Sequence, residues 1–325
     1  MCQFTVESGG TPSFVMRIVS LLPSATEIVC AIGLQDELVA VTHECDWPPS
    51  IVGKPVVTRS VNDLSDASSR DIHARVTAAM HGGSSLYALD EEALAAAKPD
   101  LILTQELCRV CAVSYREVNE VARRIDAEIT VVSLEPTSIE GILNTITTVG
   151  AMAEVEDAAI DVVEALRERL GAVEQRVASR RGAGHRAPRV VGLEWLDPPF
   201  TVGHWVPEQI RRAGGWDLLG SDGEKAHPTT WDAVAEVDPE MLFLMPCGFH
   251  LAETVREWAR TSVPPWLAEL PAVQRGAVFA LDGSAYFSRP GPRVIDGIEM
   301  VAEIMDPEGF VDIAPPGGWT PVPVG

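Results

Sequence analysis

The chain has 325 residues, a net charge of −22 and 46% hydrophobic residues, which fits a globular protein of two domains. Its 25 basic residues stand against 47 acidic ones, so a nucleic-acid partner is not expected, because phosphate binding needs Lys and Arg. The sequence shows no membrane span, and its first 16 residues lack the basic start and apolar core of a secretory signal. We therefore expect a cytoplasmic protein.

The first part of the chain alternates between short apolar runs and helical patterns. The run at 17–22 ends at Pro23 and predicts a strand, while Ser24, Glu27 and Gly33 mark a capped helix. The same criteria predict further strands at 38–41, 54–57, 101–103 and 128–134, with helices over part of 63–80, at 90–97 and at 115–125. This alternation favours a parallel sheet that is covered by helices on both faces.

A long helical pattern then interrupts the alternation. Apolar residues recur at helical spacing from 138 to 181 without a proline, which predicts one rigid segment of roughly 40 residues. A second alternation follows, with strands at 189–193, 241–245 and 277–281, helices at 207–213, 230–237, 252–260 and 293–305, and an irregular tail from 315. The sequence therefore predicts two α/β lobes, residues 17–136 and 188–312, joined by a backbone helix at 137–182.

Polar loops that carry thiols follow three of the predicted strands. Ligands bind beyond the carboxyl ends of parallel strands, so we expect these loops to face one cleft between the lobes. Thiolates select soft metals, which makes a bound zinc, iron or iron–sulfur cluster one hypothesis for this chain. The candidate ligands are Cys45, Cys108, Cys111, Cys247, His43 and His250.

These residues also have simpler interpretations. Cys108 and Cys111 fit a redox pair, or two small helix residues that face the core, and no second Cys-x-x-Cys completes a zinc ribbon. His43 and His250 fit hydrogen bonds to loop groups as well as metal or cobalt ligation. Nucleotide-binding glycine motifs and a nucleophile elbow are absent from the sequence, so catalysis is not predicted. An enzyme that reduces or trims a corrinoid stays a third hypothesis.

Five motifs resemble one family: residues 18–27, 46–49 (DWPP), 98–102 (KPDLI), 197–203 (DPPFTVG) and 288–293 (SRPGPR). Across about residues 17–306 the chain resembles the cobalamin-binding proteins of the helical-backbone substrate-binding class, relatives of the vitamin carriers of ABC importers. The resemblance implies two Rossmann-like lobes, little hinge closure, and a cobalamin or related corrinoid bound between the lobes without catalysis. Contact with an ABC permease is doubtful, because the sequence shows no export signal.

Residues in the resembling motifs and at the strand exits are the candidate corrinoid contacts. Aromatic faces stack well on a flat macrocycle, although plain core packing explains such residues equally. Arg59, Arg289 and Glu194 are suited to amide arms or to a nucleotide phosphate, and His204 is a further candidate for cobalt. The predicted contacts are Pro23, Ser24, His43, Glu44, Trp47, Arg59, Glu106, Trp195, Phe200, Trp205, Phe249, Tyr286, Phe287 and Arg289.

Overall fold

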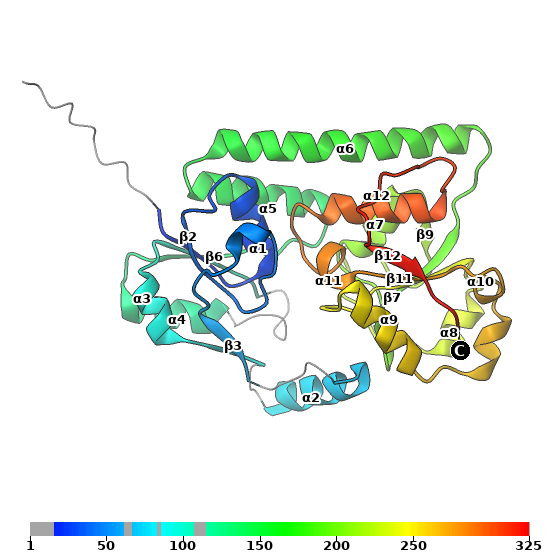
Figure 1. Cartoon of the computed structure of the whole chain (residues 1–325), viewed down its shortest axis with the longest axis horizontal. Coiled ribbons are helices and arrows are strands. Elements are labelled where there is room, and N and C mark those ends of the chain that lie inside the picture. Colours follow the sequence, from blue (N-terminus) through cyan, green and yellow to red (C-terminus); the bar gives the residue numbers. More distant parts are fainter. Residues whose placement is uncertain (1–15, 62–66, 83–85, 107–114, 325) are drawn as a thin grey trace, which may run out of the picture.

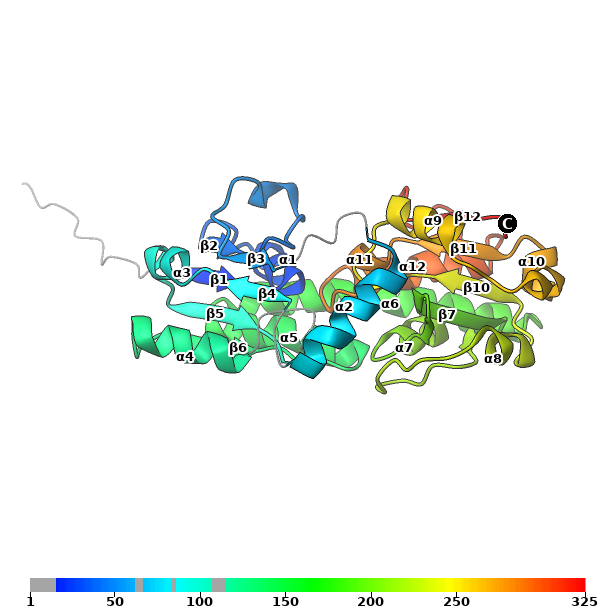
Figure 2. The same ribbon diagram turned by 90° about the horizontal axis from the view of Figure 1, so that it is seen from below.

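The computed structural model describes residues 16–61, 67–82, 86–106 and 115–324. Its N-terminal lobe (Figure 1) contains a four-stranded parallel sheet in the order β2–β1–β5–β6, which can be followed in Figure 2. These strands are β1 (Ile18–Ser20), β2 (Leu38–Val41), β5 (Leu101–Thr104) and β6 (Thr130–Ser133). The helices of this lobe are α1 (Pro23–Ala31), α2 (Ser69–Gly82), α3 (Glu91–Ala97) and α4 (Tyr115–Ile125), with a 3-10 turn η1 (Pro49–Ile51).

Helices cover both faces of this sheet, as the strand–helix alternation predicts. Side chains of a strand point alternately to its two faces. Ile18 accordingly packs with α1, whereas its neighbour Val19 packs with α3 and α4. One feature was not predicted: β3 (Thr58–Ser60) and β4 (Tyr87–Leu89) form a separate antiparallel pair, and α2 lies between them in the chain. The strand expected at 54–57 is reduced to an isolated bridge at Val56.

The C-terminal lobe is built on a six-stranded mixed sheet in the order β12–β11–β10–β7–β8, with β9 also paired to β7. Its strands are β7 (Arg189–Leu196), β8 (Pro199–Thr201), β9 (Trp216–Asp217), β10 (Met241–Leu244), β11 (Val278–Leu281) and β12 (Trp319–Pro321). Its helices are α7 (Val206–Arg212), α8 (Trp231–Glu236), α9 (Leu251–Arg260), α10 (Pro271–Gln274), α11 (Gly283–Tyr286) and α12 (Val294–Met305), with a 3-10 turn η2 (Pro265–Glu269). The tail from 315 is therefore not wholly irregular, because β12 pairs antiparallel with β11.

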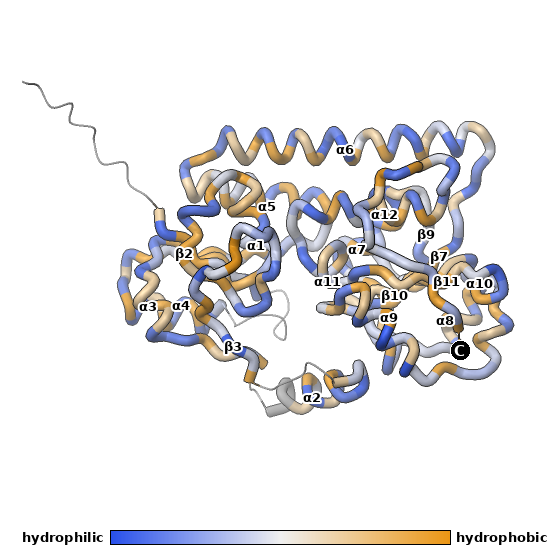
Figure 3. Tube along the Cα trace, viewed as in Figure 1, coloured by the Kyte–Doolittle hydropathy of each residue, from blue (hydrophilic) through white to orange (hydrophobic). Residues whose placement is uncertain are grey.

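The backbone segment consists of two helices, so the prediction of one continuous helix over 138–181 is wrong. Helix α5 (Ile139–Met152) ends at a tight turn, and α6 (Glu156–Gly182) then runs back along it and spans both lobes along one side of the molecule, at the top of Figure 1. Glu154 in this turn adopts a left-handed conformation, with φ of 58°. Gly150 lets the helices approach closely, since a Cβ there would lie 2.3 Å from the Cβ of Ala159. Hydrophobic and hydrophilic residues alternate along α6 (Figure 3).

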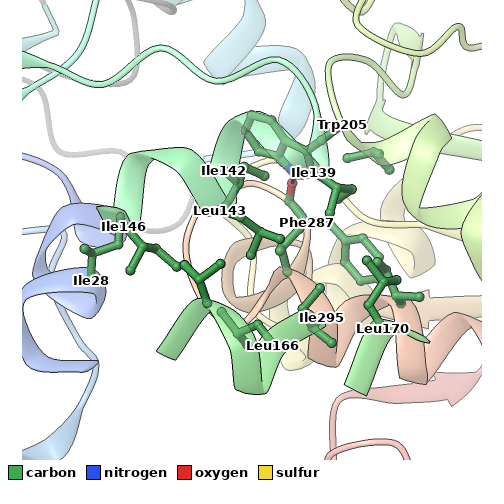
Figure 4. Close-up of a cluster of buried hydrophobic side chains, with 14 of the residues drawn as sticks. Ile28, Ile139, Ile142, Leu143, Ile146, Leu166, Leu170, Trp205, Phe287 and Ile295 are labelled. Atoms are coloured by element: carbon green, nitrogen blue, oxygen red, sulfur yellow. Dashed lines mark hydrogen bonds between the residues drawn. The ribbon is translucent and has the colours of Figure 1, made fainter. Parts of the chain in front are cut away.

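One apolar core runs through the backbone helices and into both lobes. Ile28 of α1 and Ile295 of α12 belong to the same buried cluster, together with side chains of α5 and α6 (Figure 4). Burying one such side chain contributes about 1.5–3 kcal/mol, so separating the lobes at this core would be costly. The lobes are thus fixed relative to one another on the side of α6. Within the described residues, none of the helices has the length and apolarity needed to span a membrane.

Candidate functional site

A cavity of about 140 Å³ lies between the two lobes, at the carboxyl ends of β1, β5, β7 and β10. This is where the strand-exit argument places a ligand. The N-terminal lobe contributes Leu22, Pro23, Ser24 and Gln105. The C-terminal lobe contributes Glu194, Gly203, His204, Trp205, Val206, Met245, Cys247, Phe287, Ser288, Arg289 and Pro290.

Glu194 places a carboxyl group in the wall of this cavity. The pairing of β7 with β8 shifts register between Leu193 and Trp195, and such bulges re-aim side chains. One carboxyl oxygen of Glu194 accepts a hydrogen bond from the backbone N–H of Gly203 at 3.2 Å. Burial raises the pKa of Glu194 to about 7, and the hydrogen bond from Gly203 offsets this only in part. The group is therefore partly protonated near neutral pH.

His204 follows Gly203 in the cavity wall, and hydrogen bonds from its N–H and to its carbonyl fix its backbone conformation. Its φ is 53°, its N–H donates to the Glu224 carbonyl at 2.6 Å, and its carbonyl accepts from the Gly223 N–H at 2.7 Å. Gly203 before it is tightly packed, because a Cβ there would lie 2.2 Å from the Ala226 nitrogen. Burial, with a smaller effect of Lys225, lowers the pKa of His204, so its imidazole is neutral at pH 7.

A network of ion pairs joins the lobes next to the cavity. The buried guanidinium of Arg289 donates to Asp46 at 3.1 Å and to Glu27 at 3.4 Å, and both acceptors belong to the N-terminal lobe. Arg293 on α12 also binds Glu27, at 3.0 Å between Nε and Oε2. Each arginine is thereby paired across the lobe boundary. Of the described residues that line the cavity, Arg289 is the one with a fixed positive charge, and that charge is already neutralised.

His250 extends this network of ion pairs. Its Nε2 lies 2.9 Å from Asp46 of the other lobe, and its Nδ1 lies 3.1 Å from Asp282 of its own lobe. The hydrogen bonds with Asp282 and Asp46 raise the pKa of His250 to about 10. Burial alone would raise the pKa of Asp46, but the hydrogen bonds from His250 and Arg289 outweigh it and hold that pKa well below its usual value. His250 is therefore a cationic bridge.

Helix α2 lies on the side of the molecule opposite α6, and it extends from the N-terminal lobe towards the C-terminal lobe (Figures 1 and 2). It connects two strands of the N-terminal lobe, yet its first turn is anchored to the C-terminal lobe. The Ser69 N–H donates to Glu257 at 2.7 Å, and the Ser69 carbonyl accepts from the Trp195 indole at 3.1 Å. Arg260 donates to the Ala67 carbonyl at 2.7 Å. These contacts bind α2 to the opposite lobe by its N-terminal end.

A sequence model for periplasmic binding proteins matches residues 18–285, most of the chain. The chain belongs to the periplasmic binding protein family. Proteins of this family bind solutes and are not catalytic, and the chain is accordingly a substrate-binding protein for a small molecule.

Named relatives of this periplasmic binding protein include a vitamin B12-binding protein of Vibrio cholerae, 25% identical over 289 residues, which cover 88% of this chain and 87% of the relative. An uncharacterised ABC transporter substrate-binding lipoprotein of Bacillus subtilis, YvrC, is 23% identical over 299 residues, or 90% of this chain and 81% of that one. The chain is thus similar to substrate-binding proteins of ABC importers along most of its length.

Solved structures confirm the fold. The periplasmic vitamin B12 binding protein BtuF of Vibrio cholerae superposes with a TM-score of 0.62 at 22% identity, covering 89% of this chain and 96% of that one. A periplasmic heme binding protein of Pseudomonas aeruginosa gives 0.64 at 21% identity, with coverage of 90% and 93%. At these identities the likeness establishes the fold, and it does not distinguish the two ligands.

The thiols of this periplasmic binding protein give the metal hypothesis no support in the described residues. Burial raises the pKa of Cys247, in the cavity wall, and of Cys45 to about 11. The sulfur of Cys45 instead lies 3.0 Å from the Thr26 hydroxyl. Across the described ranges, no three His, Cys, Asp or Glu side chains are grouped as a metal site. Cys108 and Cys111 lie outside the described residues.

The ring nitrogens of His43 and His250, the two other predicted ligands, face protein groups. His43 Nδ1 lies 2.7 Å from the Thr58 hydroxyl, and its Nε2 lies 3.2 Å from Glu44. His250 is held between two carboxylates, as described above. His43 and Glu44 do not line the cavity, and neither do the exposed Arg59 and Glu106.

The predicted aromatic contacts divide into two groups. Trp205 and Phe287 line the cavity, but both are largely buried and belong to the core, where the Trp205 indole donates to the Phe287 carbonyl at 3.0 Å (Figure 4). Trp195 and Phe200 instead face α2, through the Ser69 contact and through a ring contact of 5.6 Å with His73.

The remaining predicted aromatics lie near the cavity without lining it. Phe249 packs edge-on against Trp195 at 5.6 Å, and Trp47 and Tyr286 both lie against the Arg293 guanidinium. The cavity thus brings together eight of the candidate residues, which are Pro23, Ser24, Glu194, His204, Trp205, Phe287, Arg289 and Cys247. Gln105, Met245 and Ser288 were not singled out, although Gln105 and Met245 directly follow strands and that position was the available signal.

Proposed function

We propose that this protein binds cobalamin or a related corrinoid in the cleft between its lobes, without changing it chemically. The observation that supports this best is the charge of the cavity. The described residues that line the cavity are apolar or neutral, apart from Glu194 and Arg289, and Arg289 is already paired with Asp46 and Glu27. The periphery of a corrinoid consists largely of uncharged amides, whereas heme carries two carboxylates. A cavity without an unpaired cation suits the amides, and the vitamin B12-binding relatives agree with this choice.

A complete corrinoid needs more room than this conformation provides. Cavities for drug-sized ligands usually measure about 300–1,000 Å³, whereas this one measures about 140 Å³. The shared core holds the lobes together at α6, so the space must come from the opposite side, where α2 covers Trp195 and Phe200. Release of α2 would expose these rings as a stacking surface for the macrocycle. The cavity itself then receives one peripheral arm of the ligand.

Titration of the purified protein with cyanocobalamin, cobinamide and hemin tests this function, followed by calorimetry and absorption spectra. We expect a 1:1 complex with a corrinoid at micromolar concentration or below, and binding of hemin that is weaker by at least about tenfold. A preference for hemin, or no corrinoid binding, would contradict the proposal.

The cytoplasmic location expected from the sequence stays a proposal, which fractionation of the host cell tests.

A pair of neighbouring variants tests where the ligand binds. Gln105 lines the cavity and Glu106 beside it is exposed. Gln105→Trp places an indole in the cavity from its rim, so we expect corrinoid affinity to fall by more than about tenfold. Glu106→Trp adds the same ring one residue further along and should leave the affinity unchanged. Equal affinities for the two variants would place the ligand elsewhere.

A further inference from the structure

Two residues that line the cavity, Glu194 and His204, have hydrogen-bonding capacity that the protein does not use. Glu194 is bonded through one carboxyl oxygen, to the Gly203 N–H, and its other oxygen has no hydrogen bond within the described structure. Nε2 of His204 is buried and has no partner among the described residues. A buried polar atom without a hydrogen bond costs about 1–3 kcal/mol, so such atoms call for a partner. Both groups line the same cavity.

The two groups are held in position more firmly than side chains of a surface loop. Glu194 lies in a bulge of a strand at the centre of the sheet, and His204 is fixed by backbone hydrogen bonds to Glu224 and Gly223. Gly203, which donates to Glu194 and precedes His204 in the chain, is itself held by close packing against Ala226. A site that recognises part of a ligand by hydrogen bonds needs this kind of rigidity, because misplaced groups lose most of their selectivity.

The chemistry of the pair fits a primary carboxamide. The amide offers a carbonyl acceptor and an N–H donor, while a carboxyl group and an imidazole can each donate or accept. Burial lowers the pKa of His204 and raises the pKa of Glu194 to about 7. The imidazole is therefore neutral at pH 7, whereas Glu194 is partly ionised there and is largely a carboxylate, an acceptor for an amide N–H, at pH 8. A carboxylate in the same place would face Glu194 with no counter-charge available, since Arg289 is already paired with Asp46 and Glu27. The volume of about 140 Å³ suits one short arm.

We propose that Glu194 and His204 form a receptor for an uncharged carboxamide arm of the ligand and that they reject the corresponding carboxylate. This rests on the proposed corrinoid function and names the part of the corrinoid that the cavity selects. A site built to hydrogen-bond one group discriminates strongly against an analogue that leaves its polar atoms unpaired or repelled. Glu194 and His204 are thus the residues that determine specificity.

The test compares cobinamide, whose arms are amides, with cobyrinic acid, whose arms are carboxylates, by calorimetry at pH 8. We expect the unchanged protein to prefer cobinamide by more than about tenfold. Glu194→Gln keeps the shape and the acceptor for Gly203 but removes the negative charge, so the preference should shrink at least about fivefold while cobinamide still binds. His204→Asn tolerates the left-handed backbone and should weaken cobinamide at least about fivefold. Glu236→Gln, at an exposed position on α8, is the control.

The outcomes separate this inference from the proposed function. Equal affinity of the unchanged protein for both compounds, or an unaltered preference in Glu194→Gln, overturns the amide receptor and leaves corrinoid binding intact. Failure of the unchanged protein to bind either compound overturns both. Circular dichroism and the Tm of each variant establish that it is folded, and the ratio of the two affinities within one folded variant is independent of its stability.

Discussion

At the scale of single residues, Glu194 should make the stability of the protein depend on pH. Its pKa is about 7 in the folded state and 4.5 for the ordinary group. Between these values the folded state keeps a proton that the unfolded chain has lost, so the free energy of unfolding falls as pH rises through this window. A shift of this size corresponds to about 3–4 kcal/mol at most.

Chemical denaturation of the wild type and Glu194→Gln at pH 5, 6, 7 and 8 measures this effect. The Gln variant has no proton to lose there, so its stability relative to the wild type should increase from pH 5 to pH 7 and level off by pH 8. Asp217, with a pKa raised by burial to about 6, titrates in both proteins and cancels in the difference. Cys247 stays a thiol and Arg289 stays charged over this range. A difference that is constant with pH would show that Glu194 is ionised in the folded protein.

At the scale of elements, the α5–α6 hairpin depends on the close approach at Gly150. A methyl group there would lie 2.3 Å from the Ala159 Cβ, far inside contact distance. Gly150→Ala should therefore lower the free energy of unfolding by about 1–3 kcal/mol, despite the better helix propensity of alanine. Urea denaturation measures this, and Ala159→Gly in the same chain should recover most of the loss.

Gly171 on α6 provides the matched control for this substitution. A Cβ at Gly171 would meet nothing within 4 Å. Gly171→Ala should accordingly stabilise the protein by about 0.5–1 kcal/mol, because alanine loses less conformational entropy than glycine when the unfolded chain forms a helix. If both alanine variants behaved alike, the close contact between α5 and α6 would not be the cause.

The anchoring of α2 to the C-terminal lobe should control how easily this helix opens. Glu257 is 1% exposed and accepts the Ser69 N–H at 2.7 Å while it also pairs with Arg260. Glu257→Gln removes the charge that strengthens both contacts, which costs about 1–2 kcal/mol locally. Amide hydrogen exchange across α2 should then accelerate about tenfold, and corrinoid association should become faster. Glu269→Gln, at an exposed site, is the control, and unchanged exchange in the Glu257 variant would contradict this role.

The elements and the site could be predicted to different extents. The strands at β1, β5, β7 and β10 follow from local apolar runs, and they place the cavity at their carboxyl ends as expected. The turn between α5 and α6 could not be foreseen, because helical spacing persists through it and the contact of Gly150 with Ala159 is tertiary. For the same reason, nothing in the sequence indicated that α2 would bind the opposite lobe and cover Trp195.

At the scale of the whole molecule, two features oppose a large movement of the lobes. The buried cluster around α5 and α6 is shared by both lobes, and the paired charges of Glu27, Asp46, Arg289 and Arg293 cross the boundary. Breaking a buried ion pair without replacing its partner costs about 3–5 kcal/mol. Opening for a ligand should therefore be confined to α2, while the angle between the lobes is kept.

Small-angle X-ray scattering with and without cobinamide tests this rigidity. We expect the radius of gyration to change by less than about 1 Å, because a released helix of 14 residues adds little to it, whereas rotation of a whole lobe would alter it more. Hydrogen exchange in the same samples should change across α2 and remain constant along α6. A larger change in size, with exchange altered along α5 and α6, would mean that the lobes move about the backbone helices and that the ion pairs open when the ligand binds.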